Sequence, residues 1–245
     1  GRGDQTAIIY DSPITNSQSK TTFAELQTKV ANLAGALRAK GVEKGDRVII
    51  YMPMVPELAI AVLACARIGA IHSVVFAGFS AQALSDRIED AQAAMVITAD
   101  EGMRGAKTVP LKSTVDEALK ENTSVRNVIV KRVTSGKCTM VQKRDVWWED
   151  IIENSGDKSH CTPEIMNAED MLFILYTSGT TGKPKGILHT SGGYLTQAAW
   201  THHAVFDLKP DTDVYWCTAD VGWVTGHSYV VYGPLANRAT SLMYE

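Results

Sequence analysis

The stretch RVIIYMPMVPELAIAVLACARIGAIHSVVF, residues 47–76, decides the fold of this chain. It opens with the β-branched run RVIIY and closes with IHSVVF, and both compositions are typical of buried strands. Pro53 and Pro56 interrupt the chain after the first run, and the residues from Glu57 to Ile68 then follow a helical pattern. A strand, a helix and a second strand in immediate succession form a βαβ unit, which predicts two parallel strands of one sheet.

The same alternation runs outward from this unit in both directions. Upstream, Thr22 is a candidate helix N-cap with Glu25 three residues later, and Gly41 is suited to end that helix. The other expected helices are residues 57–68, 80–91, 113–120 and 147–152, and the expected strands are residues 7–10, 47–51, 71–76, 95–98, 125–130, 171–176 and 239–244. This repetition predicts an α/β fold with a doubly wound, mostly parallel sheet.

Composition and charge narrow the class of protein. With 45% hydrophobic and 21% charged residues, the 245-residue chain has the composition of a folded globular protein. A formal net charge of -3 gives no overall attraction to nucleic acid or to an anionic membrane, so neither is an expected partner. The apolar run at 58–66 is shorter than the roughly 20 residues that cross a bilayer, so we expect a buried helix there. The 4 cysteines form no Cys-x-x-Cys pair, which favours a reducing, cytoplasmic setting.

The strand expected at 171–176 runs directly into TSGTTGKPKG, residues 177–186. Its glycines let the backbone approach a ligand, its hydroxyls can donate to phosphate oxygens, and its lysines supply positive charge. The motif differs from the P-loop of common NTPases, because Pro184 stands where that loop has the Ser or Thr that holds magnesium. An ordinary surface turn is the alternative, but the position after a buried strand favours a phosphate-binding loop. The expected phosphate-binding residues are Thr177, Ser178, Gly179, Thr180, Thr181, Gly182, Lys183 and Lys185.

With Tyr176 in front, this loop resembles the signature loop of the adenylate-forming superfamily, which includes acyl-CoA synthetases, luciferases and peptide-synthetase adenylation domains. The resemblance implies that the loop holds the β- and γ-phosphates of ATP, which leave as pyrophosphate when a carboxylate attacks the α-phosphorus. Stabilising the charge of a departing polyphosphate is a task that such donors suit. Lys183 and Thr180 are therefore the expected catalytic residues.

Two further regions resemble the acetyl- and propionyl-CoA synthetases among the AMP-forming acyl-CoA synthetases. Residues 64–80 are similar to their first subdomain, and WCTADVGWVTGHSY at 216–229 is similar to a segment near their acyl pocket and the entrance for the CoA thiol. By this resemblance, Trp223, Val224 and Thr225 are expected to form the wall of a pocket for a small acid, with Thr225 also near CoA. By composition alone, Trp223 and Val224 would be assigned to the core.

The segment TADEGMRGAK at 98–107 resembles the Arg-Ala-Gly-Arg segment that contacts the nucleotide phosphates of CoA in acetyl-CoA synthetases. The residues expected to bind CoA are Arg104, Gly105, Ala106 and Lys107. Lys107 stands where Arg is commoner, which keeps the charge but loses bidentate geometry and implies weaker binding of the CoA phosphate. Without the resemblance, Arg104 and Lys107 would be interpreted as solvated surface charges.

The resemblance implies an acetate:CoA ligase that uses acetate, ATP, Mg2+ and CoA. Residues 1–245 are expected to be part of a large N-terminal AMP-binding domain, without the small C-terminal domain and without the residues that bind adenine, ribose and magnesium. The chain alone is therefore expected to be inactive, and no metal site is expected within it. The alternatives are a synthetase for propionate or another short acid, and a non-catalytic nucleotide-binding module. The sequence leaves the oligomeric state open.

Overall fold

The computed structural model describes residues 2–13, 16–105, 107–134, 137–153, 161–177 and 184–245. Its strands are β1 (Thr6–Ser12), β2 (Ser17–Thr22), β3 (Arg47–Tyr51), β4 (Ile71–Val74), β5 (Met95–Ala99), β6 (Gly102–Arg104), β7 (Lys107–Val109), β8 (Asn127–Lys131), β9 (Asp145–Trp147), β10 (Met171–Thr177), β11 (Lys185–Thr190), β12 (Val214–Trp216) and β13 (Thr240–Tyr244). Its helices are α1 (Phe23–Ala39), α2 (Pro56–Arg67), α3 (Ala81–Ala91), α4 (Leu111–Ala118), α5 (Trp148–Glu153), α6 (Ser191–Ala204), α7 (Val224–Gly226), the π-helix η1 (His227–Tyr232) and α8 (Gly233–Ala236). The strands and helices expected from the sequence all form, with ends that differ by at most two residues.

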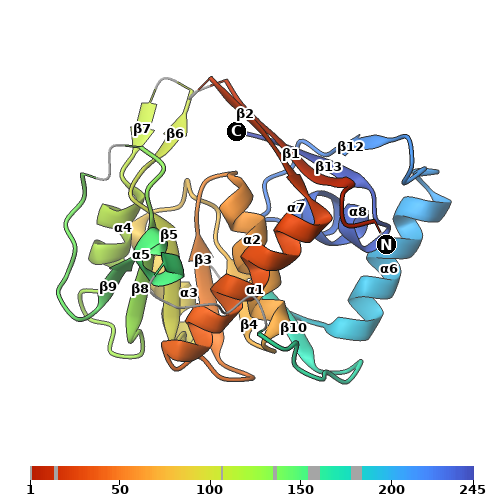
Figure 1. The fold of residues 1–245 in the computed structure, drawn as a ribbon. Helices are drawn as coiled ribbons and strands as arrows, with labels where there is room; N and C mark the ends of the chain where they lie inside the picture. The colour runs from red at the N-terminus through yellow and green to blue at the C-terminus, as the bar shows by residue number, and fades with distance from the viewer. Residues whose placement is uncertain (1, 14–15, 106, 135–136, 154–160, 178–183) are drawn as a thin grey trace.

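The central sheet contains seven strands in the order β11-β10-β4-β3-β5-β8-β9 (Figure 1). The strands from β10 to β9 are parallel, and β11 runs antiparallel to β10 at one edge. The predicted doubly wound, mostly parallel sheet is therefore confirmed.

Strand β3 shows how the two faces of this sheet are covered. Successive side chains of a strand point to opposite faces, and here Val48 and Ile50 join one buried cluster while Ile49 and Tyr51 join another. The first cluster includes residues of α1 and α2, and the second includes residues of α3 and α4. Helix α2 is the buried helix predicted from the apolar run at 58–66, and most of its side chains are buried within the protein.

The chain reverses direction across the sheet at the neighbouring strands β3 and β5. From β3 it passes through α2, on one face, to β4; from β5 it passes through α4, on the other face, to β8 in the opposite direction. Two neighbouring strands whose connections leave in opposite directions on opposite faces open a crevice beyond their carboxyl ends, which is where open α/β sheets bind ligands. The residues that follow β3 and β5, and those that follow the adjacent β4, are therefore placed at a candidate site.

A second sheet joins the beginning and the end of the described chain. Its order is β12-β13-β1-β2, with β1 parallel to β13 and antiparallel to β2 (Figure 1). Strand β1 had been expected from its sequence, but as part of the alternation that builds the central sheet. Its pairing with β13 depends on residues more than two hundred positions away, which a local pattern does not encode.

Helix ends follow local capping chemistry, which the sequence predicted for α1. Thr22 and Glu25 form a reciprocal capping box at the start of α1, and Gly41, which follows the helix, has a φ of +82°. The Ser80 hydroxyl accepts a hydrogen bond from the Ala83 N–H at the start of α3. Local chemistry thus fixes both ends of α1 and the start of α3.

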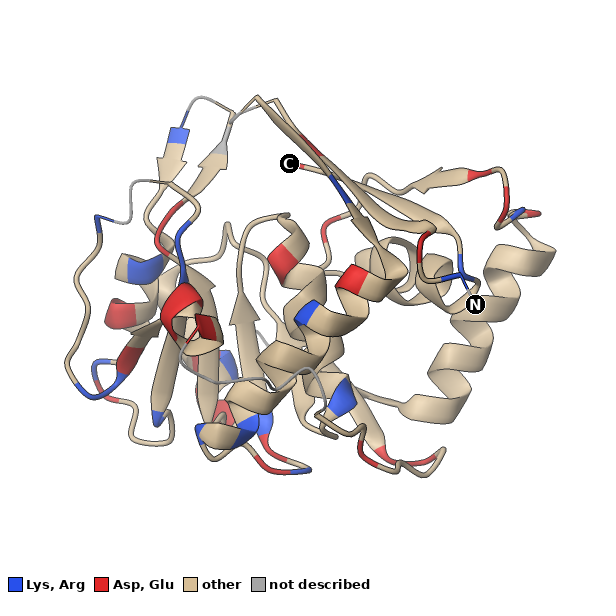
Figure 2. Cartoon of the chain, in the orientation of Figure 1, with Lys and Arg blue, Asp and Glu red and all other residues tan. Residues whose placement is uncertain are grey.

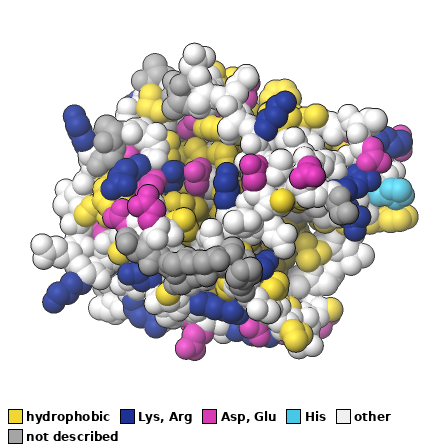
Figure 3. Space-filling model, in the orientation of Figure 1, with side chains coloured by type: hydrophobic (Ala, Val, Ile, Leu, Met, Phe, Trp, Pro, Cys, Tyr) yellow, Lys and Arg dark blue, Asp and Glu magenta, His cyan; other side chains and the backbone are white. Residues whose placement is uncertain are grey.

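Lys, Arg, Asp and Glu side chains are interspersed over many of the elements, whereas α6 carries none of these four residue types (Figure 2). Figure 3 shows hydrophobic side chains gathered in patches between these charges. Among the described residues, no helix is both long enough and apolar enough to cross a membrane. The four cysteines are free thiols.

Candidate active site

A cavity of about 160 Å³ lies at the crevice beyond the carboxyl ends of β3 and β4. It is lined by Pro53, Met54, Phe76, Ala77, Gly78, Gly102, Met103, Val109, Leu111, Asp220 and Glu245. The lining thus comes from the turns after β3 and β4, from the β6–β7 hairpin and the start of α4, from the segment before α7, and from the residue after β13. A larger groove of about 700 Å³ lies between α3 and residues 117–124, away from the crevice, and brings together none of the expected site residues.

Aromatic rings form one wall beside this cavity. The ring centroid of Trp223 lies 6.3 Å from that of Phe76 and 6.1 Å from that of Phe79. Gly222 makes this approach possible, because a Cβ there would lie 2.9 Å from the Phe76 backbone nitrogen. Trp223 and Val224 are 48% and 47% exposed, which contradicts the alternative that they are core residues. Thr225 is also exposed, so all three expected pocket residues have accessible side chains.

Two carboxylates that the sequence interpretation left without a role also line the cavity. Asp220 accepts a hydrogen bond from the Gly222 N–H at 2.6 Å, and burial nevertheless raises the pKa of Asp220 above its ordinary value. Glu245 accepts hydrogen bonds from the hydroxyls of Tyr10 at 2.6 Å and Ser12 at 2.7 Å. Its other oxygen, Oε1, is buried without a hydrogen-bond partner among the described residues. Their signal in the sequence was weak: each is a single acid in a largely uncharged stretch.

Carboxylates at this place restrict what the cavity can hold. An anionic ligand would be repelled by Asp220 and Glu245, while an N–H group could donate to either one. The remaining lining is largely apolar. The cavity therefore suits an uncharged, amide-bearing chain better than a phosphate or a free acid.

The segment expected to bind CoA forms the β6–β7 hairpin, which projects at the top of the view in Figure 1. Arg104 pairs with Lys107 across the hairpin, so both expected cations stand at one turn. Gly105 has a φ of +60° and open space around its Cα, which fits a tight turn and leaves room for a ligand. Lys107 is exposed. Ala106 and the Arg104 side chain lie outside what the structure describes.

Both ends of this hairpin are tied to the central sheet. Before it, the Asp100 carboxylate accepts hydrogen bonds from the Glu101 and Val133 N–H groups, each at 2.8 Å. After it, the Lys112 N–H donates to the Asp100 carbonyl at 3.2 Å and begins α4. The base of the hairpin is thus fixed while its cationic turn projects.

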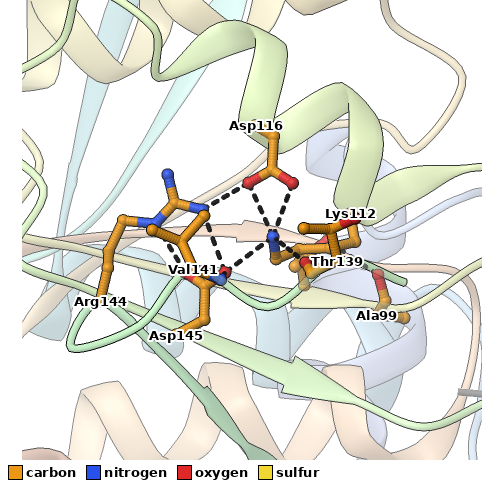
Figure 4. Close-up of polar contacts among 8 residues, drawn as sticks. Ala99, Lys112, Asp116, Thr139, Val141, Arg144 and Asp145 are labelled. Atoms are coloured by element: carbon orange, nitrogen blue, oxygen red, sulfur yellow. Dashed lines mark hydrogen bonds and ion pairs between the residues drawn. The ribbon is translucent and has the colours of Figure 1, made fainter. Parts of the chain in front are cut away.

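Lys112 is also the centre of a buried ionic network (Figure 4). Its side chain is fully buried, and its Nζ lies 2.7 Å from Asp116 Oδ1, 2.8 Å from Asp145 Oδ2 and 2.9 Å from the Thr139 carbonyl. Arg144 binds both carboxylates. Burial would raise the pKa of Asp145, but hydrogen bonds from Arg144 and Lys112 hold it below its ordinary value. The network fastens the segment 139–145 to α4, directly behind the hairpin.

The phosphate loop begins at the carboxyl end of β10, beside β4. Ser178, Gly179, Thr180, Thr181, Gly182 and Lys183 lie outside the described residues. The neck of the loop is described: Thr177 faces Lys185, and Tyr176 faces Gly186, across the β10–β11 pair. Lys185 and Gly186 were expected in the loop, but they begin strand β11, because their backbone pairs with the end of β10.

Neutral rings back the neck of the loop on strand β10. The Phe173 ring packs between His189 at 4.4 Å and His227 at 4.6 Å, and His227 stacks on His72 with centroids 5.6 Å apart. Burial lowers the pKa of His227 to about 4 and that of His72 well below its ordinary value. Both imidazoles are therefore neutral at pH 7. His72 Nδ1 and His227 Nε2 have no hydrogen-bond partner among the described residues.

The described part of the chain contains no cluster of three or more His, Cys, Asp or Glu side chains placed to hold a metal ion. The charged groups that line the cavity are instead the two carboxylates, and the charged residues expected to bind CoA at the hairpin are cations. The described site is therefore a mostly apolar cavity at the carboxyl edge of the sheet, with the β6–β7 hairpin contributing to its lining and the neck of the loop at the same edge.

Comparisons with known proteins identify the family of this chain. The model of the family "AMP-binding enzyme" matches residues 1–245. Acetyl-coenzyme A synthetase of Nostoc linckia is 59% identical over 244 residues, which cover 100% of this chain and 72% of that protein. Acetyl-coenzyme A synthetase of Streptomyces coelicolor is 60% identical over 245 residues, covering 100% of this chain and 37% of that protein.

A solved structure gives the same fold. Acetoacetyl-CoA synthetase from Streptomyces lividans superposes with a TM-score of 0.87 at 30% sequence identity, covering 98% of this chain and 36% of that one. The chain thus spans little more than a third of several of the proteins it matches. The resemblance to AMP-forming acyl-CoA synthetases that the loop and its neighbours suggested is confirmed over the whole of this sequence, and the chain belongs to the AMP-binding enzyme family.

Proposed function

We propose that this chain supplies the phosphate loop and the CoA-binding hairpin of an AMP-forming acetate:CoA ligase. In the first step, the acetate carboxylate attacks the α-phosphorus of ATP, giving acetyl-adenylate and pyrophosphate. In the second, the CoA thiol attacks the acetyl carbonyl carbon, giving acetyl-CoA and AMP. The relatives named acetyl-coenzyme A synthetase support this choice of acid.

The observation that carries the proposal is the placement of three features at one edge of the central sheet. The neck of the phosphate loop follows β10, the cavity follows β3 and β4, and the cationic hairpin follows β5. In parallel strands the carboxyl ends meet at the same edge. A nucleotide held by the loop and a second phosphate-bearing substrate held by the hairpin would therefore meet above the cavity.

On the ATP side, Lys183 and the Thr180 hydroxyl would stabilise the negative charge of the departing pyrophosphate. Thr177, at the end of β10, and Lys185, at the start of β11, would position the two ends of the loop. The magnesium ion that accompanies ATP finds no donor cluster among the described residues, so no step of the proposal depends on one.

On the CoA side, Arg104 and Lys107 would bind the nucleotide phosphates, with Gly105 and Ala106 leaving room for them. The cavity would take the amide-bearing arm of CoA, whose N–H groups can donate to Asp220 or Glu245. Trp223, Val224 and Thr225 stand exposed beside this cavity and would bound the small acyl group where the thiol arrives. Acetate itself would bind outside the carboxylate-lined part of the cavity, because like charges repel.

Acetate-dependent exchange of labelled pyrophosphate into ATP is the decisive test, made on the protein of the full reading frame. Exchange that requires acetate supports the first step, and later formation of acetyl-CoA on addition of CoA supports the second. Exchange that proceeds equally without a carboxylic acid would refute the proposal.

A synthetase for a different short acid is the nearest competitor, and the structural likeness to an acetoacetyl-CoA synthetase keeps it in view. Each methylene that a tight pocket rejects costs roughly 1–3 kcal/mol in transition-state binding. Turnover measured with acetate, propionate, butyrate and acetoacetate would rank them, and a maximum at any acid other than acetate would replace the substrate while keeping the reaction.

A non-catalytic nucleotide-binding module is the competitor of another class. It would bind ATP without any exchange of pyrophosphate, so the same assay separates the two. Mg2+ dependence and a cytoplasmic location stay predictions.

A further inference from the structure

Arg87, on α3, is a buried cation that the proposed chemistry does not use. Only 7% of it is exposed, and its Nη1 donates to the Ala83 carbonyl one turn earlier. Its guanidinium carbon lies 4.7 Å from the ring centroid of Phe79 and 5.5 Å from that of Tyr176. Arg87 therefore joins two aromatic rings that belong to different parts of the site.

One of these rings, that of Tyr176, belongs to the neck of the phosphate loop. Its hydroxyl donates to Asp90 Oδ2 at 2.7 Å, so α3 holds Tyr176 at two points, one turn apart. Burial and the neighbouring Asp90 raise the pKa of Tyr176 above its ordinary value, which keeps the phenol protonated as a donor. A Cβ on Gly186 would lie 3.3 Å from the Tyr176 ring, so the ring also packs on the other side of the neck.

The second ring, Phe79, belongs to the aromatic wall beside the cavity. Its centroid lies 6.1 Å from that of Trp223 with the planes at 80°, and 5.7 Å from that of Phe76. The Tyr51 hydroxyl, at the end of β3, donates to the Phe79 carbonyl at 2.8 Å. Phe79 is thus fixed to the carboxyl end of the central sheet while its ring supports Trp223.

Stability alone gives no reason for a charge at this position. Burial lowers the pKa of Arg87 from its ordinary value, yet a guanidinium stays charged because that value is so high. Burying such an ion is costly, and an apolar side chain of similar length would pack there without that cost. What the guanidinium adds is a planar, charged face that attracts two rings at once.

We propose that Arg87 is a positioning residue that fixes the neck of the ATP phosphate loop relative to the Trp223 wall of the acyl and CoA cavity. This inference rests on the proposed function, because the two parts matter to each other only if ATP and the acid react between them. In-line attack at the α-phosphorus requires both to be held within a fraction of an ångström. Arg87 itself would touch neither substrate.

The test compares two substitutions of the same kind in the protein of the full reading frame. Arg87→Met removes the charged plane, and Arg47→Met serves as the matched control. Arg47 donates to the Ala91 and Gln92 carbonyls at the far end of α3, where the strands begin. Both variants lose a partly or fully buried arginine that contacts α3, but only Arg87 faces the site.

Wild-type protein must first show acetate-dependent pyrophosphate exchange; its absence would overturn the proposed function and this inference together. With exchange present, we expect Arg87→Met to lower kcat/KM for ATP about 5- to 20-fold, the range of a partly buried cation–π contact. Arg87→Lys should recover part of the loss, because it keeps charge without the planar face. The two variants are compared under conditions in which both are folded. Equal exchange by Arg87→Met and Arg47→Met would then overturn the inference and leave the proposed function intact.

If Arg87→Met fails to fold, Tyr176→Phe replaces it. This variant removes only the hydroxyl that donates to Asp90 and keeps the ring beneath Arg87. We expect kcat/KM for ATP to fall about 2- to 5-fold, the cost of one hydrogen bond to a charged acceptor that is partly exposed. An unchanged value would show that the hydrogen bond to Asp90 does not position the neck. An unchanged value in Tyr176→Leu, which also removes the ring beneath Arg87, would overturn the inference.

Discussion

The two sides of the candidate site rest on buried clusters of opposite kind. Behind the β6–β7 hairpin, Lys112 is fully buried and lies within 3 Å of the carboxylates of Asp116 and Asp145. Behind the phosphate loop, β10 packs on the neutral imidazoles of His72 and His227, each with an unpartnered nitrogen among the described residues. The hairpin side is therefore stable only while its charges are present, and the loop side only while its rings stay uncharged.

The largest effect is expected where a charge is removed from the hairpin side. Lys112→Met leaves Arg144 as the one cation, among the described residues, that binds Asp116 and the fully buried Asp145. Breaking a buried ionic network on one side costs about 3–5 kcal/mol, because the remaining charge is uncompensated. Urea unfolding should show this loss.

Lys120→Met is the matched control for that change. Lys120 follows the same helix, is 65% exposed on its side chain and pairs only with Glu117 in the described chain. Exposed pairs of this kind contribute about 0–1 kcal/mol. Equal destabilisation by the two variants would show that the Lys112 network is no anchor.

On the loop side, the largest effect is expected on catalysis and not on stability. Removing one group that stabilises developing charge lowers kcat about 100- to 1,000-fold. We expect such a loss of pyrophosphate exchange for Lys183→Ala in the protein of the full reading frame, with the unfolding free energy unchanged. Lys209→Ala, which removes an exposed lysine beside Asp207, is the control. Exchange retained by Lys183→Ala would remove that lysine from the proposed chemistry.

Mild acid should lower the stability that the histidine cluster behind the loop contributes, and leave that of the Lys112 network unchanged. The pKa of His227 is about 4 in the folded chain against 6.5 ordinarily, so between these values the unfolded chain binds a proton that the folded chain does not. Stability then falls as pH falls, by about 2 kcal/mol between pH 7 and pH 5 for this one residue. Asp145, whose pKa is lowered from 3.8, loses its contribution only below that range. Unfolding free energies at the two pH values measure the difference.

The variant His227→Asn should reduce that pH dependence, because it removes one of the cluster's two buried rings with a lowered pKa and leaves His72 in place. His203→Asn, at an exposed position on α6, should leave it unchanged. Retention of the full slope in His227→Asn would assign the acid sensitivity to other groups, and the contrast between the two clusters would lose its main support.

Sequence reasoning reached the parts of this site that local patterns encode. The unit from β3 to β4 followed from its apolar runs, and the helix start at Thr22 followed from capping chemistry. The resemblance of the loop and of the hairpin to known segments supplied their expected roles. These features need only neighbouring residues, which is why they could be predicted.

The remaining features depend on contacts across the chain. Asp220 and Glu245 meet in one cavity because β13 pairs with β1, and Arg87 joins Phe79 to Tyr176 only after α3 has packed on the sheet. Lys185 pairs with Thr177 although it belongs to the loop motif. No periodicity or motif in one sequence encodes such pairings, because their partners are far apart along the chain.

The smallest effect is expected at the turn of the hairpin, where the contrast between the two sides can be sharpened with one residue. Lys107 is exposed and stands across from Arg104. Lysine contacts a phosphate as a point charge, whereas arginine can donate two parallel hydrogen bonds. Lys107→Arg should therefore lower KM for CoA about 3-fold and Lys107→Ala should raise it about 10-fold, in line with the strength of charge-assisted hydrogen bonds. Acetate-dependent pyrophosphate exchange, which precedes CoA binding, should be the same in both variants. A change in exchange that matches the change in KM for CoA would mean that the hairpin and the loop do not act on separate steps.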